Sequence, residues 1–315
     1  MQIAIVGAGA IGGFLAAALA RSGANVAVVA RGEHRAAIAR DGLIVDASDF
    51  GSFSVRVDAG DDVRDFLPLD VAILTFKSHQ WPALMPQLEA AARTGTAIVT
   101  MQNGLPFWFR RDPVLQSVDP DGRIGALFPD CQTIGAVVHV SGRITAPGHV
   151  HQSGGTRYVL GALDPAVQTR VDDLAAVMRA AHLQPESTER IRHFVWLKLV
   201  NNVGLNPISA LYHRSISQML SDPVTRAQVR ALMAEALAVG QALGVVEDVD
   251  IDGRIAYAER LSDVQTSMLQ DLLAGRPLEL DPIVGAVVEL GDDLGVPVPQ
   301  LRDVYQRLAS QTATR

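Results

Sequence analysis

The sequence predicts an α/β first half built on a mainly parallel sheet, followed by an all-helical second half. In the first half, short runs of β-branched residues alternate with segments of helical periodicity, a pattern typical of parallel strands joined by crossover helices. Beyond residue 188 the apolar residues keep helical spacing almost throughout, and Gly or Pro residues separate the segments. The chain is therefore expected to form two domains, residues 1–187 and 188–315.

The predicted elements follow from these patterns in chain order. The first strands are expected at Ile3–Val6, Asn25–Ala30, Val71–Phe76 and Ala97–Met101, with helices at 11–21 and 81–93. Glycine-punctuated runs predict further strands at Gly135–Val140, Gly148–Gln152 and Tyr158–Leu160, before a helix at 165–181. The segment Gln184–Ser187 is turn-like and is the predicted linker. Breaks in the helical half are expected near Pro207, Gly244, Gly275–Pro277 and Pro297–Pro299.

Composition narrows the class of protein. The formal net charge of −7 over 315 residues does not favour nucleic acid or an anionic membrane as a partner. The single cysteine, Cys131, cannot form an internal disulfide, and a structural role suits it better than a nucleophilic one. No basic region precedes the first apolar run, and no apolar stretch is long enough to span a bilayer. A cytoplasmic protein without a metal site is expected, and a homodimer is compatible with the sequence.

The segment Gly7–Gly12, read Gly-Ala-Gly-Ala-Ile-Gly, follows the first strand and opens the first helix. Gly7 permits the tight turn, Gly9 lets the backbone approach a pyrophosphate, and Gly12 lets helix and strand pack closely. The helix N-terminus, with Ala10 and Ile11, then faces the phosphate charge. This context predicts a Rossmann-like dinucleotide-binding domain, whereas a turn of small residues is the alternative.

The end of the second strand indicates which dinucleotide binds. NAD-binding chains usually place an acidic residue there to accept the ribose 2′-hydroxyl. This strand instead ends at Arg31, with Arg35 one turn later, and an arginine can pair with a 2′-phosphate. NADP(H) is therefore the predicted cofactor. The alternative is that Arg31 is a solvated surface residue.

Two further candidates follow strands of the same domain. Lys77 comes after the strand 71–76, and Asn103-Gly104 comes after the strand 97–101. Ligands of open parallel sheets bind at the carboxyl ends of the strands. Lys77 and Asn103 are therefore candidate cofactor-binding residues, although each would be an ordinary loop residue if it stood alone.

In the helical half, Lys198, Asn202 and Asn206 are spaced four residues apart and share one helical stripe. Asparagine is a poor choice for a helix interior, so this stripe indicates a site. Pro207 is expected to break the helix and to turn Asn206 toward a cavity. The alternative is a lysine that extends along the surface to solvent and asparagines that bond between helices.

This helix carries the pattern W-x-K-x-x-x-N-x-x-x-N-P from Trp196 to Pro207 and resembles the ketopantoate reductase (2-dehydropantoate 2-reductase) family. A second resemblance lies in the segment 266–271, read Thr-Ser-Met-Leu-Gln-Asp, and in Glu279-Leu280-Asp281. Threonine stands there for the first serine of the family's S-S-M-L-Q-D motif. The glycine motif, Arg31, Lys77 and Asn103-Gly104 match as well, so the resemblance covers nearly the whole chain.

The resemblance implies NADPH-dependent reduction of 2-dehydropantoate to pantoate, a step of pantothenate biosynthesis. A small-molecule 2-oxo acid is the implied substrate. Lys198 is the implied acid for the developing alkoxide, because a desolvated lysine has a pKa closer to neutrality. Glu279 is the implied partner of Lys198 or of the substrate's hydroxyl. The substrate-binding residues that the resemblance implies are Asn103, Asn202, Asn206 and Ser267.

The chain departs from the family pattern after Asn103-Gly104. Three aromatic residues, Phe107, Trp108 and Phe109, precede a longer segment at 112–121. They are a packing patch, or they reshape the pocket for another 2-oxo acid, or they pack against a partner subunit.

Three alternative functions remain open: a reductase of a different 2-oxo acid, a β-hydroxyacid dehydrogenase and a non-catalytic NADP-binding sensor. A sensor would not need Lys198 and its companions together.

Overall fold

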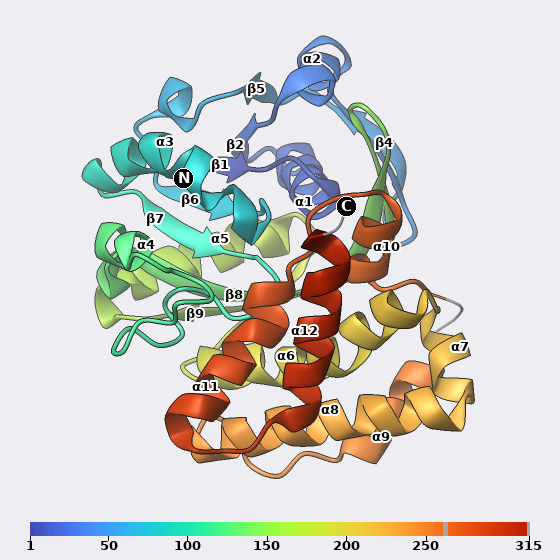
Figure 1. The fold of residues 1–315 in the computed structure, drawn as a ribbon. Helices are drawn as coiled ribbons and strands as arrows, with labels where there is room; N and C mark the ends of the chain where they lie inside the picture. The colour runs from blue at the N-terminus through green and yellow to red at the C-terminus, as the bar shows by residue number, and fades with distance from the viewer. Residues whose placement is uncertain (261–263, 314–315) are drawn as a thin grey trace. The chain divides into compact units, whose positions relative to one another are not determined.

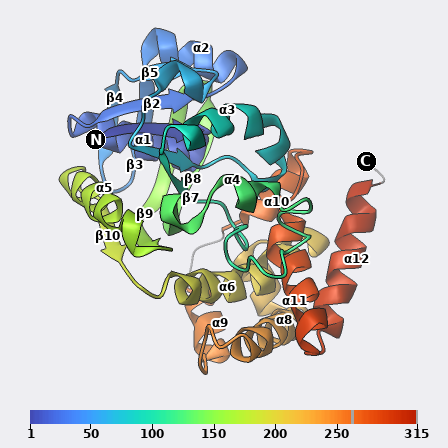
Figure 2. The same ribbon diagram turned by 90° about the vertical axis from the view of Figure 1, so that its left-hand side faces the viewer.

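The computed structural model describes residues 1–260 and 264–313 and forms two compact units (Figures 1 and 2). The first comprises Met1–Gln102 and Ile124–Ile191, and the second comprises Asn103–Arg123 and Arg192–Arg315. An α/β half followed by a helical half is confirmed. The last segment of the second unit begins at Arg192, close to the predicted boundary at 187/188. The grouping of residues 103–123 with the helical unit was not predicted.

The first unit is built on one ten-stranded sheet in the order β4-β3-β9-β8-β7-β6-β1-β2-β5, with β10 paired to β9. Its strands are β1 (Gln2–Val6), β2 (Asn25–Val29), β3 (Leu43–Ala47), β4 (Gly51–Val55), β5 (Asp58–Gly60), β6 (Val71–Leu74), β7 (Ala97–Thr100), β8 (Thr133–Ala146), β9 (His149–Ala162) and β10 (Gln184–Ser187). Its helices are α1 (Ala10–Arg21), α2 (Gly32–Asp41), α3 (Trp81–Arg93), α4 (Arg123–Leu127) and α5 (Gln168–Ala180), with 3-10 helices η1 (Val63–Phe66), η2 (Ser78–Gln80), η3 (Asp130–Gln132) and η4 (Pro165–Val167). Only the pairs β3–β4 and β8–β9 are antiparallel, so the sheet is mainly parallel as predicted.

The strand order reverses at β1, which pairs in parallel with β2 on one side and with β6 on the other. In open α/β sheets such a reversal leaves a crevice at the carboxyl ends of the strands, where ligands bind. The glycine turn leaves β1 at this end. The topology therefore places the predicted dinucleotide motif at the position that a dinucleotide would occupy.

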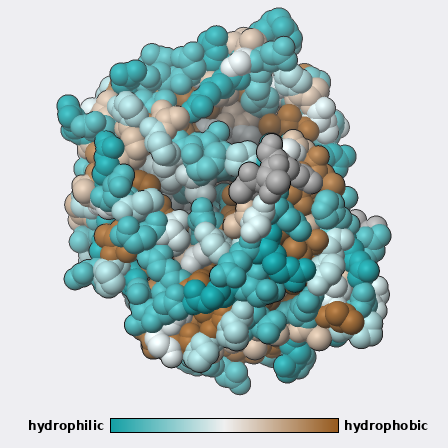
Figure 3. Space-filling view, in the orientation of Figure 1, coloured by the Kyte–Doolittle hydropathy of each residue, from teal (hydrophilic) through white to brown (hydrophobic). Residues whose placement is uncertain are grey.

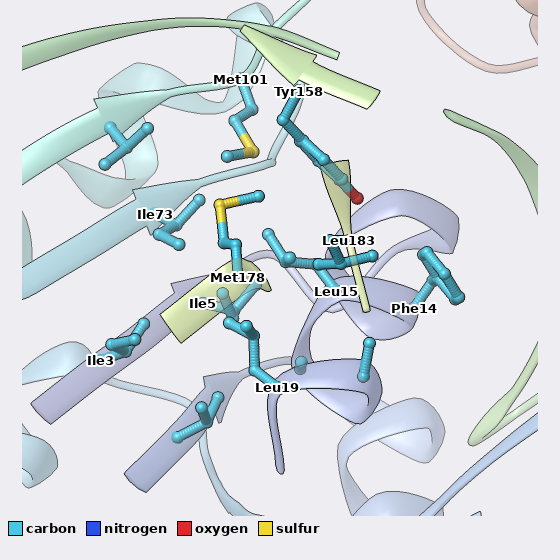
Figure 4. Packing of buried hydrophobic residues seen from close by; sticks show 14 of the residues in the cluster. Ile3, Ile5, Phe14, Leu15, Leu19, Ile73, Met101, Tyr158, Met178 and Leu183 are labelled. Carbon is cyan, nitrogen blue, oxygen red and sulfur yellow. The ribbon is translucent and has the colours of Figure 1, made fainter. Parts of the chain in front are cut away.

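A continuous apolar core fixes α1 and α5 against one face of the sheet (Figure 4). Ile3 and Ile5 of β1 point into this core with Leu15 and Leu19 of α1, while Met178 of α5 closes it. The alternate residues of β1 and of its neighbours are also buried, as expected for a parallel sheet covered on both faces. The rigid core holds the start of α1, and with it the glycine turn, in place.

Several predicted details of the first unit are wrong. The runs at 148–152 and 158–160 belong to one strand, β9, which forms a long antiparallel hairpin with β8. The pair accommodates the intervening glycines through register irregularities, so glycine does not end the strand. The segment 184–187 is not a linker turn but strand β10, where Pro185 is tolerated on an outer strand. Strands β3, β4 and β5 were not predicted.

The second unit is helical and centres on α8, which contacts α7, α9, α11 and α12. Its elements are α6 (Ile191–Tyr212), α7 (Ile216–Ser221), α8 (Pro223–Ala242), α9 (Ile251–Glu259), α10 (Ser267–Leu273), the π-helix η5 (Asp281–Gly285), α11 (Ala286–Leu294) and α12 (Pro299–Ala313). The breaks at 244, 275–277 and 297–299 are confirmed. No helix among the described residues meets the length and hydropathy needed to cross a membrane.

Hydrophilic residues cover most of the molecular surface that faces the viewer in Figure 3.

The expected break at Pro207 is wrong, because α6 continues through it to Tyr212. A proline inside a helix removes one backbone hydrogen bond. The helix α6 nevertheless continues past Pro207, and it packs closely against α8. Gly204 lies where a Cβ atom would come within 2.6 Å of Met233 on α8. The fully buried Trp196 donates its indole N–H to the Ala236 carbonyl at 3.1 Å. These contacts fix the helix that carries Lys198.

Candidate active site

In the first unit, the glycine turn has the geometry that the motif predicts. Gly7 adopts a positive φ of 104°, and a Cβ atom there would lie 2.7 Å from the Phe76 amide nitrogen. Gly9 is the N-cap of α1, and no side chain caps this helix end. A Cβ atom on Gly9 would meet nothing within 4 Å, so open space faces the helix start. Uncapped N–H groups at this end suit a phosphate.

Gly12 is required for close packing of helix and strand. A Cβ atom on it would overlap the Gly7 carbonyl oxygen and the Thr75 hydroxyl. Thr75 donates its hydroxyl to the Gly7 carbonyl at 2.5 Å and so ties the turn to the end of β6. Sequence reasoning did not single out Thr75, because a lone threonine after a strand carries no distinctive signal.

Arg31 is exposed and occupies the N-cap of α2, two residues beyond the end of β2. This is the strand end that the cofactor prediction requires. Lys77 is half-buried and follows β6, where its backbone N–H donates to the Gln80 side chain at 3.1 Å. Both predicted cofactor residues of the first unit thus lie at the carboxyl edge of the sheet.

In the second unit, Lys198, Asn103 and Glu279 form one cluster. Lys198 Nζ donates to Asn103 Oδ1 at 3.0 Å. Asn103 Nδ2 lies 3.5 Å from Glu279 Oε2, a long and weak hydrogen bond. Glu279 is 6% exposed, whereas Lys198 is half-buried. Asn103 therefore links the lysine to the carboxylate, a role that the sequence did not indicate.

The start of the π-helix η5 holds Asn103 in this position. The Leu105 amide donates to the Pro282 carbonyl at 2.7 Å. Gly104 has a positive φ of 84°, and a Cβ atom there would overlap the same carbonyl oxygen. Asp281 accepts a hydrogen bond from the Tyr305 hydroxyl at 2.6 Å, and this bond raises the pKa of Tyr305 to about 12. In the Glu-Leu-Asp motif, Glu279 therefore belongs to the cluster, whereas Asp281 binds Tyr305 of α12.

Two opposing effects set the pKa of Lys198. Burial lowers it, because the charged ammonium loses solvation, and the negative charge of Glu279 raises it in part. The net result lowers the pKa of Lys198 from 10.5 to about 8. A lysine with this pKa remains largely protonated at neutral pH but releases its proton far more readily than an ordinary lysine.

The other predicted substrate residues lie on α6 and at the start of α10. Asn202 is half-buried one turn after Lys198, and Asn206 is 6% exposed one turn further on. Ser267 is exposed at the first position of α10, and the buried Thr266 caps this helix by accepting from the Leu269 amide. Threonine replaces the family's serine at Thr266 without loss, because either hydroxyl can cap a helix.

The aromatic segment after Asn103 is part of the apolar interior of the second unit. Phe107, Trp108 and Phe109 are all buried, and the Phe109 ring centroid lies 5.5 Å from that of Trp196. Arg192 donates to the Phe109 carbonyl at 3.1 Å. Of the three interpretations, this burial favours the packing patch.

Gly104→Ala should lower kcat as well as stability. The positive φ alone costs about 1–2 kcal/mol for a residue with a Cβ atom. The overlap with Pro282 should also displace Asn103 from Lys198. Gly275→Ala is the matched control, because Gly275 has a φ of 64° and a Cβ atom there meets nothing within 4 Å. Thermal unfolding and steady-state kinetics should show a loss of stability in both variants and a loss of kcat only in Gly104→Ala. Equal kcat values would contradict this role of Gly104.

Comparison with known proteins assigns the chain to a family. The family model described as "Ketopantoate reductase PanE/ApbA" matches residues 3–165. The one described as "Ketopantoate reductase PanE/ApbA C terminal" matches residues 190–311. The chain belongs to the ketopantoate reductase family.

Curated members of this family match over nearly the full chain. The chain is 38% identical over 310 residues to the 2-dehydropantoate 2-reductase of Mesorhizobium japonicum, covering 96% of this chain and 94% of that protein. Among solved structures, the 2-dehydropantoate 2-reductase of Methylococcus capsulatus superposes with a TM-score of 0.85 at 29% identity, covering 100% of this chain and 97% of the other. D-Mandelate dehydrogenase, solved with NADH and anilino(oxo)acetate, shares the fold at a TM-score of 0.84 and 20% identity, covering 100% of this chain and 99% of its own.

Proposed function

We propose that this protein reduces 2-dehydropantoate to pantoate with NADPH, a step of pantothenate biosynthesis. The observation that carries this proposal is the cluster of Lys198, Asn103 and Glu279, which combines a lysine of lowered pKa with a buried carboxylate. Full-length similarity to proteins named 2-dehydropantoate 2-reductase supports the choice of substrate. In this proposal residues 1–187 bind the cofactor and residues 188–315 carry the catalytic lysine.

The residues of the first unit fit a dinucleotide. The glycine turn and the uncapped start of α1 would hold the pyrophosphate, while Lys77 adds a positive charge at the same sheet edge. The fold itself does not decide between NADH and NADPH, because D-mandelate dehydrogenase shares it and was solved with NADH. Arg31 supports NADPH in this proposal, since a guanidinium can pair with a 2′-phosphate where an acidic residue would repel it.

The chemistry needs a hydride and a proton. When bound, NADPH supplies the hydride to the keto carbon of the substrate. Negative charge then develops on the keto oxygen, and Lys198 donates a proton to it. Asn103 orients the ammonium group, and Glu279 keeps it charged by raising its pKa. The side chains of Asn202, Asn206 and Ser267 would bind the carboxylate and hydroxyl of the substrate.

The pH dependence of reduction should report the pKa of Lys198. The acid must be protonated, so kcat/KM should be level below about pH 8 and fall about tenfold per pH unit above it. Glu279→Gln should move this break to lower pH, because the charge that raises the lysine pKa is removed. Initial rates measured from about pH 6 to about pH 10 would test this. A profile that stays level to about pH 10 would contradict the role of Lys198 as an acid with a pKa of about 8.

The substrate is tested by a panel of branched, linear and aromatic 2-oxo acids, with NADPH oxidation followed in the purified protein. We expect 2-dehydropantoate to give the highest kcat/KM. Another acid that exceeds it by more than about tenfold, about 1.4 kcal/mol in transition-state binding, would overturn the substrate but keep the reaction class. Absence of turnover with every acid would support a cofactor-binding sensor instead.

A further inference from the structure

His34 is hydrogen-bonded through both ring nitrogens to two separate segments of the first unit. It lies in the first turn of α2, and its Nε2 is 2.6 Å from the Ala8 carbonyl oxygen. The Gly148 amide, in the turn between β8 and β9, lies 3.0 Å from Nδ1. Because a backbone N–H can only donate, Nδ1 must be the unprotonated acceptor. Nε2 therefore carries the hydrogen and donates it to Ala8.

The Ala8 carbonyl lies inside the glycine turn, between Gly7 and Gly9. The carbonyl of Ala8 and the N–H of Gly9 belong to one planar peptide unit and point to opposite sides. Holding the carbonyl toward α2 therefore fixes the direction of the Gly9 N–H. Gly9 is also the N-cap of α1, whose start has no side-chain cap. The donor from His34 thus acts on the backbone that would meet the pyrophosphate.

His34 belongs to α2, the same helix whose N-terminus is at Arg31. Arg31 is the N-cap of α2, and His34 follows it by three residues. The imidazole therefore connects the turn proposed for the pyrophosphate with the turn proposed for the 2′-phosphate. We propose that His34 is a positioning residue that locks these two turns together and thereby sets the affinity for NADP(H). This inference rests on the proposed cofactor.

A purely structural role makes a different prediction. In that case His34 would serve to attach α2 to the β8–β9 turn through Gly148, and the bond to Ala8 would be incidental. Two substitutions test the two hydrogen bonds of the imidazole separately. In His34→Gln the amide nitrogen is placed near the position of Nε2, so a donor to Ala8 is kept. In His34→Asn the amide oxygen is placed near Nδ1, so only the acceptor for Gly148 is kept.

The test is the Kd of NADPH, measured by fluorescence titration of wild type, both variants and His182→Asn. His182 is an exposed histidine of the same unit with a φ of 60°, a conformation that asparagine tolerates. We expect Kd to rise about tenfold in His34→Asn, the loss typical of a carbonyl deprived of its donor, and to change less than about threefold in His34→Gln and the control. Hydrogen exchange of the amides at 8–12 should accelerate in His34→Asn alone, and kcat at saturating NADPH should be unchanged.

Equal Kd values in both His34 variants, or equal losses that track their melting temperatures, would overturn the positioning role. A wild-type protein that binds no NADPH would instead overturn the cofactor proposal, and this inference with it. The two failures are therefore distinguishable from the wild-type titration alone.

Discussion

Lys198→Ala is expected to lower kcat by roughly 10²–10⁴-fold, the range typical of a lost general acid. The affinity for NADPH should stay almost unchanged, because the residues proposed to hold the phosphates belong to the first unit. The expectation follows from the pKa of about 8, which makes Lys198 a competent acid, and from its bond to Asn103. Steady-state kinetics together with a direct measurement of the Kd of NADPH would test both parts.

Lys198→Arg separates proton donation from simple charge. An arginine keeps a cation beside Glu279, but its pKa is far higher than that of Lys198, so it is a poor acid. We therefore expect kcat to remain low while the melting temperature stays closer to wild type than that of Lys198→Ala. Asn201→Ala is the control on the same helix, because Asn201 accepts a hydrogen bond from Arg254 rather than from Lys198. Turnover within a few-fold of wild type in folded Lys198→Ala would end the proposed mechanism.

The parts of the site that depend on local backbone geometry could be predicted from the sequence. The glycine turn is one example, because the steric reason for each glycine lies within a strand, a turn and a helix that are adjacent in sequence. Gly7 has the positive φ that the motif requires, and Gly12 has the close packing. Arg31 likewise lies just beyond β2, because residues that are two positions apart in sequence stay close in space.

The parts that depend on contacts distant in sequence could not be predicted from spacing. Lys198 and Asn103 are 95 positions apart, and Asn103 and Glu279 are 176 positions apart. No periodicity connects residues at such separations. Their grouping in one unit also depends on residues 103–123 leaving the first unit, for which the sequence offers no signal. The resemblance to the family indicated Lys198 and Glu279, but it did not indicate that Asn103 links them.

Arg31→Ala is expected to weaken NADPH binding by about tenfold to about a hundredfold, as for the loss of a hydrogen bond between charged groups. Binding of NADH should change by less than about threefold, because NADH lacks the 2′-phosphate. Arg40→Ala is the matched control, since Arg40 is an exposed arginine near the other end of α2 that pairs with Asp41.

The comparison of the two cofactors in one variant is what makes this test specific. A loss of fold or of the glycine turn would weaken both cofactors alike, because the pyrophosphate is common to them. Only a group that contacts the 2′-phosphate can weaken NADPH alone. The ratio of the two Kd values, measured by titration at a fixed ionic strength, therefore isolates the contribution of Arg31 from general damage. Equal losses for NADPH and NADH would show that Arg31 is a solvated surface residue, and the preference for NADPH would then need another source.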